Sequence, residues 1–486
     1  MTGGEQANAA GEGSSGEGVW AELLAPAQLL ATITVSLGIV LFAFNAFLVG
    51  TALPSAVAEL GGGALMSWSV SLYLVTAIVT GAATALVMQR IGARRMFFLA
   101  ALTCLAGTII CGLAPNMPVL LGGRLLQGAS SGFIEAGCYV LIPRLFPPRL
   151  IPKVFGVEAI AWAVAAFGGP AVAGYLAEAF SWRLSFLSLL PLIVLFLVLV
   201  PVVVPRGMDE VAVRRVPVLP LAGLACGMLL VTVASIAPTR LMMAGLLALA
   251  AVVFILTVAG DGRRAVQLFP AQAFRLSSVI GLGLWVALLM PLAEAASSVY
   301  LVYALQYLWG YSALLAGLVS AIIALSWSAT QFLLATWGTA RLRRHMIWVG
   351  AVLLVAGLAG TALAFQLSSI WLMVASQIVT GMAFGTNWSA LSQTLMEQAP
   401  AHERDAVSGL LPTVMAAGYG IGAALFGVIA NMLHASDPQS PTLLSGMLWL
   451  FAAAGIIAIP AAMAAIRMVA LLGRPARGAF ASGHPA

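Results

Sequence analysis

Three carboxylates, Glu135, Glu158 and Glu294, lie inside segments that otherwise have the composition of membrane-spanning helices. An ionisable side chain in hydrocarbon costs roughly 2.5–3.5 kcal/mol, so it persists mainly where it faces a polar interior or a partner. A carboxylic acid in such a place can also take up and release a proton at small net cost. The three acids are therefore candidates for proton transfer within the membrane. For each of them, the alternative is a neutral acid hydrogen-bonded between two helices.

Arg124 is a further ionisable residue in an apolar segment, where an arginine must find hydrogen-bond acceptors or an anion. Glu135 follows it by eleven residues. This separation is about three helical turns, which places both side chains on nearly one face of a helix. Tyr139 lies one turn further along that face. If Arg124 faces a central cavity, we expect Glu135 and Tyr139 to face it too.

Aromatic and amide side chains in other spans extend this set. Aromatic rings can line an apolar cavity and stack on cationic ligands. Packing within the protein or contact with lipid is the alternative for any single ring. The residues predicted to line a substrate cavity are Asn45, Gln127, Tyr139, Trp162, Tyr300, Trp327 and Trp388.

The chain that positions these residues has the composition of an all-α integral membrane protein. Of its 486 residues, 62% are hydrophobic and 8% are charged, whereas a soluble domain carries about 25% charged residues. A helix needs about 20 apolar residues to cross a bilayer. Fourteen candidate spans lie near 30–54, 67–88, 95–114, 118–143, 153–178, 184–204, 216–236, 240–259, 277–306, 311–335, 345–366, 369–396, 405–433 and 442–470.

The basic residues predict how these spans are oriented. Nineteen of the 22 basic residues fall in loops after even-numbered spans or at the C-terminal end, while only Arg183 and Arg240 fall in the opposite loops and Arg124 lies within a span. Lysine and arginine collect on the cytoplasmic side of membrane proteins. We therefore expect both termini in the cytoplasm and the chain in a bacterial-type inner (plasma) membrane.

Several other kinds of function lack their sequence signals. The four cysteines do not have metal-ligand spacing, and neither a P-loop nor a dinucleotide-binding fingerprint is present. The net charge of +6 comes from residues in short loops, which indicates topology and not nucleic-acid binding. The sequence thus predicts no cofactor, no metal, no enzymatic activity and no nucleic-acid partner, and it leaves an ion gradient as the energy source.

An internal repeat predicts how the spans are grouped. Arg124, Gly128 and Gly132 have the spacing of Gln377, Gly381 and Gly385, at an offset of 253 residues. Gly156, Gly169 and Gly174 match Gly409, Gly422 and Gly427 at the same offset, although chance matches among 50 glycines are the alternative. The repeat maps spans four and five onto twelve and thirteen, which predicts two six-helix bundles with two helices inserted between them. Transporters built from parallel repeats carry their site between the halves.

The predicted organisation has five parts. Residues 1–27 form a disordered cytoplasmic tail, 28–206 the N-terminal six-helix bundle, and 207–262 the two inserted helices. Residues 263–472 form the C-terminal bundle, and 473–486 a second cytoplasmic tail. The N-terminal segment has neither the positive start nor the short apolar stretch of a secretory signal.

Five stretches carry a family resemblance. They are the Gly-Pro-x-x-x-Gly pattern of Gly169, Pro170 and Gly174, the Arg-x-x-Gln-Gly element Arg124 to Gly128, the basic loop Gln89 to Arg95, the stretch Asn45 to Pro54 that ends in Ala-Leu-Pro, and Gln306 followed by Gly310-Tyr311-Ser312. In these stretches the chain resembles the major facilitator superfamily. More narrowly, it is similar to the fourteen-span drug:proton antiporter family, over about residues 30–470.

The resemblance implies roles for particular residues. It places Arg124 beside proton-coupling acids, for which this chain offers Glu135, Glu158 and Glu294. It assigns conformational gating to Gln89, Arg90, Gly92, Arg94, Gly169, Pro170 and Gly174. Two departures matter, because the family has an aspartate where Gln89 and Asn45 stand. Gln89 cannot form the charged pair of the inner gate, and Asn45 cannot titrate.

A second-half acid stands in a position that corresponds to the lost one. If the halves align at the offset of 249 that pairs Arg94 and Arg95 with Arg343 and Arg344, Glu294 falls opposite Asn45. The sequence therefore predicts a monomeric, proton-coupled exporter of hydrophobic or cationic small molecules that works by alternating access. One alternative is a dedicated exporter or importer of a single metabolite, lipid or siderophore. Another is a non-transporting membrane scaffold.

Overall fold

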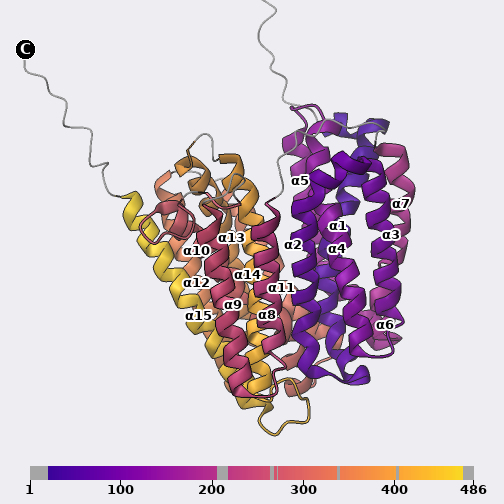
Figure 1. Ribbon diagram of the computed structural model, residues 1–486. Helices are drawn as coiled ribbons and strands as arrows, with labels where there is room; N and C mark the ends of the chain where they lie inside the picture. Colours follow the sequence, from indigo (N-terminus) through magenta and orange to yellow (C-terminus); the bar gives the residue numbers. More distant parts are fainter. Residues whose placement is uncertain are drawn as a thin grey trace, which may run out of the picture.

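A computed structural model of the chain describes residues 20–204, 217–262, 268–270, 272–335, 340–400 and 404–473, and in these ranges it is helical (Figure 1). Helices satisfy every backbone hydrogen bond within one segment, which hydrocarbon requires. In chain order the elements are η1 (Trp20–Leu24), α1 (Pro26–Leu60), η2 (Gly63–Leu65), α2 (Met66–Ile91), α3 (Ala93–Gly112), α4 (Met117–Leu145), α5 (Ile151–Ala179), α6 (Trp182–Leu187), α7 (Leu190–Val203), α8 (Val218–Ala234), α9 (Arg240–Asp261), α10 (Val279–Trp309), α11 (Ala313–Ala335), α12 (Ala340–Gln366), α13 (Ile370–Gln398), α14 (Arg404–Met432) and α15 (Leu443–Leu472).

Twelve segments of the described chain are long and apolar enough to cross a bilayer. Two further helices pack among them: α8 is shorter, at 17 residues, and α13 has 29 residues but carries many polar side chains. The predicted span 184–204 is divided into α6 and α7, because Pro191 starts a new helix at α7. The chain is therefore a multi-pass membrane protein with twelve to fourteen helices suited to span the bilayer.

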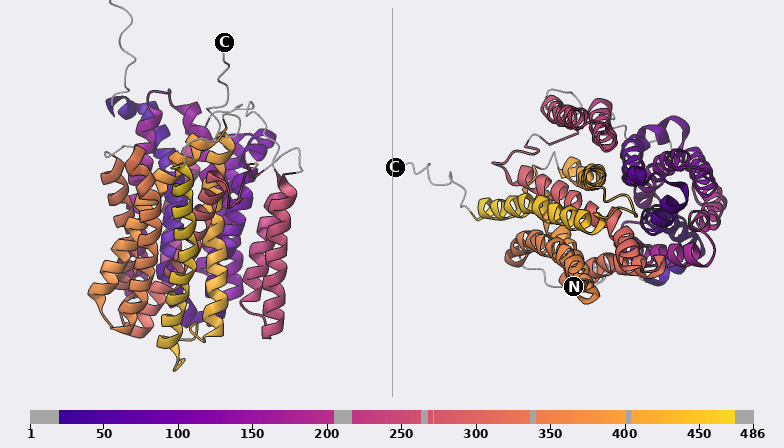
Figure 2. Two further views of the ribbon diagram at one scale, coloured as in Figure 1. Left: turned by 90° about the vertical axis from the view of Figure 1, so that its left-hand side faces the viewer. Right: turned by 90° about the horizontal axis from the view of Figure 1, so that it is seen from below.

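The helices form two bundles with a pair of helices beside them (Figures 1 and 2). Helices α1 to α7 make the first half, and α10 to α15 make the second half. Helix α8 packs against α2 of the first half and α14 of the second, and α9 packs on α8. The inserted pair thus lies along the line where the two halves meet.

Equivalent glycines set the helix packing inside each half. Gly128 of α4 lies against the backbone of Tyr73 in α2, and Gly132 lies against Ala77. In the second half, Gly381 and Gly385 of α13 lie against the backbone of α11 in the same way. A side chain at any of these positions would collide with the neighbouring helix. The predicted repeat is therefore also a repeat in three dimensions.

The two halves are joined at one end of the molecule. We name the end where α1 begins and α15 stops the terminal end, and the other the opposite end. At the opposite end the Tyr307 hydroxyl donates to the carbonyl of Pro54 over 3.3 Å. The backbone N–H of Leu314 donates to Glu178, and the Asn431 amide donates to the carbonyl of Ala64 over 3.0 Å. Figure 1 shows the ribbons of the two halves converging towards this end, at the bottom of the view.

Candidate functional site

Arg124 of α4 is the centre of a buried polar cluster in the first half. Its side chain is only 1% exposed. The guanidinium donates to the amide oxygen of Asn45 in α1 over 2.6 Å and to that of Gln127 over 2.8 Å. It also donates to the carbonyl of Ser69 in α2 over 3.1 Å, and it lies 4.2 Å from the ring centroid of Tyr73. The cluster therefore connects α1, α2 and α4.

All these partners of Arg124 are neutral. Buried charges are normally paired with an opposite charge. No salt bridge to Arg124 is found among the described residues, and the amide nitrogen of Asn45 has no hydrogen-bond partner there. Carbonyl oxygens and the face of an aromatic ring thus stabilise this cation in place of a carboxylate.

Glu158 of α5 is the buried acid with the clearest local geometry. Its side chain is 3% exposed, and one carboxyl oxygen accepts a hydrogen bond from the hydroxyl of Ser36 in α1 over 2.9 Å. The other carboxyl oxygen is buried without a partner among the described residues. Because α5 packs along α1, the acid is held between two helices of the first half. The second carboxyl oxygen can therefore take up a proton without breaking the hydrogen bond to Ser36.

Glu135 belongs to the same neighbourhood as Glu158. Both acids act electrostatically on the thiol of Cys138 and on the hydroxyl of Tyr139. The ring of Tyr139 stacks on Phe155 of α5, with centroids 6.2 Å apart. Two carboxylates from α4 and α5 therefore lie close enough to influence one another's surroundings.

The shared face predicted for α4 is found only in part. Arg124 is enclosed, whereas Tyr139 is 40% exposed and Glu135 is half-buried. The helix α2 fills the space beside Arg124, and this packing cannot be seen from spacing along α4. Tyr73 of α2 lies near both ends of this face, since its hydroxyl interacts electrostatically with Arg124 and with Glu135.

A run of aromatic rings links the arginine cluster to the acids. Phe42 of α1 lies 6.1 Å from Tyr73 and 5.9 Å from Trp162, centroid to centroid. Phe47 approaches the same Trp162 edge-on at 6.1 Å. Trp162, predicted as a cavity residue, thus lies between Arg124 and the Glu135–Glu158 pair. The run offers an apolar, polarisable wall on the inner side of α1 and α5.

Glu294 of α10 is the buried acid of the second half. It is 3% exposed, and its carboxyl group accepts a hydrogen bond from Ser298 over 2.8 Å. Tyr419 of α14 also interacts with this carboxyl group. Helices α1 and α10 end at Gly61 and Gly310, both at positive φ, and these glycines have the 249-residue offset that aligns Asn45 with Glu294. The geometry of the helix ends supports the predicted correspondence.

The remaining predicted cavity residues lie on helices of the second half. Tyr300 of α10 is buried beside Tyr303, with centroids 6.5 Å apart. Trp327 of α11 stacks on Phe384 at 4.9 Å, and its indole donates to Gln331. Trp388 of α13 is half-buried against the core. The structure therefore gathers Asn45 and Gln127 around Arg124, and Tyr139 and Trp162 around Glu158, but it holds these three rings in the other half.

The predicted gating residues form two groups. Gln89 and Arg90 are exposed at the end of α2, and Arg94 donates to the carbonyl of Val204 over 2.8 Å. Gly92 joins α2 to α3 at a φ of 81°, a conformation that favours glycine.

The second gating group lies on α5. Gly169 contacts Phe47 of α1, Pro170 lies beside Gly317 of α11, and Gly174 lies against the backbone of Leu314 in the same helix. The glycine pattern of α5 therefore forms the crossing between the two halves.

Four functional partners were not predicted from the sequence. Ser36 and Tyr73 hold Glu158 and Arg124, and Ser298 and Tyr419 hold Glu294. Only Ser298 carried a local signal, since it lies one helical turn after the acid. Among the described residues, no group of three His, Cys, Asp or Glu side chains could hold a metal ion.

Sequence comparisons place the chain among membrane transporters. A family model described as Major Facilitator Superfamily matches residues 35–305 and 283–484. The chain is 29% identical over 461 residues to a Mycobacterium tuberculosis protein described as a probable multidrug-efflux transporter, covering 92% of this chain and 97% of the relative. It is 24% identical over 424 residues to an uncharacterized transporter of Escherichia coli, covering 84% and 90%.

Solved structures share the fold. A bacterial homologue of the human lysosomal transporter Spinster, in an inward-facing and unoccupied conformation, superposes with a TM-score of 0.66 at 15% identity, covering 92% of this chain and 98% of that one. A D-xylose–proton symporter gives 0.63 at 16% identity, covering 90% and 97%. At these identities the likeness concerns the arrangement of helices.

Proposed function

Because the chain belongs to the Major Facilitator Superfamily, we propose that it is a proton-coupled secondary active exporter of hydrophobic or cationic small molecules. The observation that carries the proposal is Glu158, a carboxyl group in a spanning helix with one oxygen bound to Ser36 and the other unpaired. The similarity to a probable multidrug-efflux transporter supports the substrate class. The aromatic wall around Trp162 supports it as well.

The proposed coupling rests on the position of the acid. Helix α5 carries Glu158, and the same helix crosses to the second half through Gly174. An ionised carboxylate is costly wherever water is excluded, so a movement that closes the surroundings of Glu158 requires its protonation. Proton binding would therefore favour one arrangement of the halves, and release would favour the other. Glu135 shares the first-half site, and Glu294 provides a site in the second half.

The proposed topology places the terminal end in the cytoplasm of a bacterial-type inner membrane. The excess of basic residues in the loops at that end supports it. On this assignment the halves touch at the outer side, and the chain has fourteen spans in the order six, two inserted, six. The helix α8 beside α2 and α14 supports this division. We propose that the transporter acts as a monomer, since one chain supplies both halves.

A dedicated transporter of a single metabolite, lipid or siderophore is the second candidate. Two residues favour it, because Asn45 and Gln89 replace acids that the drug:proton antiporters carry. Asn45 gives Arg124 a neutral partner, so no carboxylate at that position attracts a cationic drug. A drug-susceptibility panel separates the candidates: a deletion strain that stays as resistant as its parent to every cationic and hydrophobic compound supports the dedicated transporter.

Proton-driven flux in proteoliposomes tests the proposed coupling. We expect Glu158→Gln, Glu135→Gln and Glu294→Gln each to reduce proton-driven export of a fluorescent cation by about a hundredfold or more, the low end of typical general acid–base effects. Substrate exchange without a gradient should persist, because glutamine keeps the shape of the side chain. Wild-type flux should fall as the pH rises on the side that supplies protons, whereas the flux of the variants should not.

The control is Glu22→Gln, which removes an acid from an exposed ion pair with Arg149 at the terminal end. This variant should retain wild-type coupling. A triple Glu→Gln variant that still exports at the wild-type rate would rule out the carboxylates as the coupling sites. Export driven equally well by a sodium gradient would contradict the proposal that the coupling ion is the proton.

A further inference from the structure

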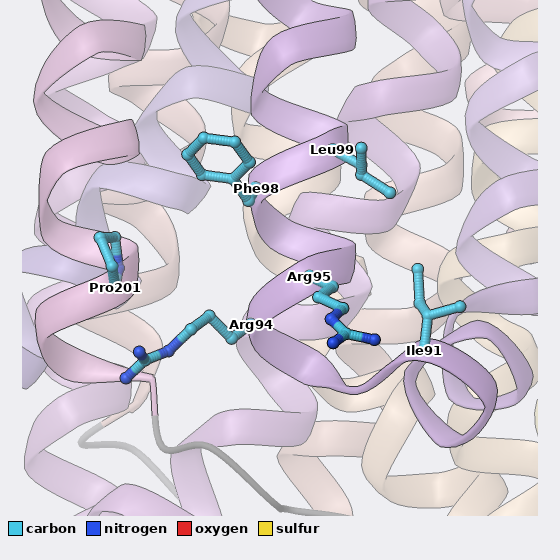
Figure 3. Close-up of a pocket in the computed structure, with 6 residues that line it drawn as sticks. All are labelled: Ile91, Arg94, Arg95, Phe98, Leu99 and Pro201. Carbon is cyan, nitrogen blue, oxygen red and sulfur yellow. The ribbon is translucent and has the colours of Figure 1, made fainter.

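A pocket of about 410 Å³ opens at the terminal end of the molecule, where α2 and α7 stop and α3 begins (Figure 3). Neither the buried acids nor the aromatic wall contributes to it. The described residues that line it are Ile91, Arg94, Arg95, Phe98, Leu99 and Pro201. Two cations and four apolar side chains thus share one cavity at the level where the spanning helices end.

The polar part of the pocket consists of two arginines, and no described residue that lines the pocket is acidic. Arg94 uses its Nε to donate to the carbonyl of Val204, and its side chain extends towards the end of α7, whereas Arg95 points towards Ile91 on the other side of α3 (Figure 3). Arg95 is exposed, and within the described ranges neither arginine forms a salt bridge. Residues 89–95, which join α2 to α3, begin with Gln89 and contain no aspartate or glutamate.

The position of the arginines on α3 also favours an anion. Both lie in the first turn of the helix, which contains no acidic residue, and the N-cap Gly92 offers no side chain. Cations are unfavourable at a helix N-terminus because the helix dipole is positive there. A phosphate bound at this point would interact favourably with the end of the helix and with the positive charge that the two arginines place on either side of it.

The apolar part of the pocket continues along the membrane-facing surface. Figure 3 shows Phe98 and Leu99 further along α3 than the two arginines, with Pro201 on the neighbouring α7. Phe98 and Leu99 are exposed on a helix that is long and apolar enough to cross a membrane, where a lipid acyl chain can cover them. A free phosphate would leave this apolar wall uncovered.

We propose that this pocket is a binding site for an anionic phospholipid. Arg94 and Arg95 attract the anionic headgroup from the two sides of the start of α3, and Phe98, Leu99 and Pro201 contact the adjoining acyl chain. The bound lipid bridges α3 and α7, next to the loop between α2 and α3. The site is independent of the proposed coupling acids, so it stands or falls separately from proton transport.

Lipid binding to the full-length protein tests this site. The purified protein in detergent is titrated with phosphatidylglycerol, with zwitterionic phosphatidylcholine and with inorganic phosphate, and bound lipid is counted by native mass spectrometry. We expect selective binding of phosphatidylglycerol, with an affinity that falls about fivefold for each arginine removed in Arg94→Gln/Arg95→Gln. The matched control is Arg467→Gln, which removes an exposed arginine near the same end of α15, outside the pocket. This control should bind as the wild type does.

Two further variants separate headgroup from chain recognition. Arg95→Gln alone removes a side chain without a salt-bridge partner, and it keeps the test valid if the double variant fails to fold. Phe98→Ala should weaken phosphatidylglycerol binding and leave any binding of inorganic phosphate unchanged. Equal affinity of the wild type and the folded double variant for phosphatidylglycerol would overturn the proposal. Inorganic phosphate that displaces the lipid at equal concentration, or equal binding of phosphatidylcholine, would overturn it as well.

Discussion

At the scale of single residues, the neutral partners of Arg124 are the feature that the polar cluster depends on. A buried guanidinium with neutral partners depends on each of its carbonyl acceptors, because among the described residues only these oxygens and the ring of Tyr73 offset its loss of hydration. Asn45 gives the shortest of these hydrogen bonds, at 2.6 Å. The amide of Asn45 therefore joins α1 to α4 by accepting a hydrogen bond from Arg124, and it leaves the positive charge of Arg124 without a counter-charge.

Substitution of Asn45 tests this dependence. Asn45→Leu removes the acceptor and should lower the free energy of unfolding by about 2 kcal/mol, the typical contribution of a hydrogen bond to a charged group. Asn45→Asp has nearly the same shape and restores the acceptor with a negative charge, so its thermal midpoint should stay at or above that of the wild type. Thermal melts in detergent measure both. A leucine variant as stable as the parent would show that Arg124 does not need this partner.

At this scale the sequence was better at identifying ionisable residues inside the helices than at identifying their hydrogen-bond partners. The acids and Arg124 could be found because ionisable residues are rare in apolar segments. Ser36 could not be paired with Glu158, since the two lie 122 residues apart and serine is common in such helices. The pocket around Arg94 could not be predicted from the sequence either, because it depends on where Pro201 of α7 packs against α3.

At the scale of helices, glycine determines how closely α4 approaches α2 and how closely α13 approaches α11. Gly128 and Gly381 occupy equivalent places in the two halves, each against the backbone of its partner helix. Without a side chain the helices meet at short range, and van der Waals packing replaces the hydrophobic effect that lipid cannot supply.

A methyl group is enough to test this packing. Gly128→Ala should destabilise the protein by about 1–3 kcal/mol, the usual cost of overpacking. Gly381→Ala should act similarly. Gly122→Ala, in the same helix but with open space around it, serves as the control and should be neutral or stabilising by up to about 1 kcal/mol. If thermal melts give the same midpoint for the variants at 122 and 128, the close approach of α2 and α4 does not constrain the fold.

The helices were partly predictable because the length of an apolar segment and the spacing of its glycines can both be read directly from the sequence. Two features were not. The span 184–204 breaks at Pro191, although proline also occurs inside uninterrupted helices such as α10 at Pro291. Helix α13 has so many polar residues that it falls outside the twelve apolar segments. Its place in the bundle follows from packing against α11 and α12.

At the scale of the whole molecule, hydrogen bonds at the opposite end add to the packing of α5 on α11 and of α2 on α14, which joins the two halves. Glu178 accepts from Leu314, and Asn431 donates to the backbone of Ala64. Each such bond contributes about 1 kcal/mol. A shift of a few kcal/mol exchanges the populations of two arrangements, so these contacts are sufficient to bias which end of the molecule is closed.

The variants Glu178→Ala and Asn431→Ala should open this end. A cysteine introduced at Thr51, which faces Gly317 across the halves and is buried, reports the opening through its rate of maleimide labelling. We expect labelling to accelerate about fivefold for each bond lost, above the background from exposed Cys226. The control is Asn116→Ala, which removes a helix cap within the first half at the same end. Unchanged rates in both interface variants would show that these bonds do not close the molecule.

The inserted helix α8 constrains any such rearrangement. Its final residues meet both halves, because Ser235 accepts from Trp68 of α2 through its hydroxyl and from Asn431 of α14 through its carbonyl. Further along, Met228 lies against Gly420 of α14 and belongs to one apolar cluster with Val75 of α2. Methionine is flexible and adapts to a changing neighbour. The insert is therefore held by directional hydrogen bonds where the bundles touch and by adaptable apolar contacts elsewhere, so that a loss of the bonds at Ser235 would leave only contacts that adjust to either half.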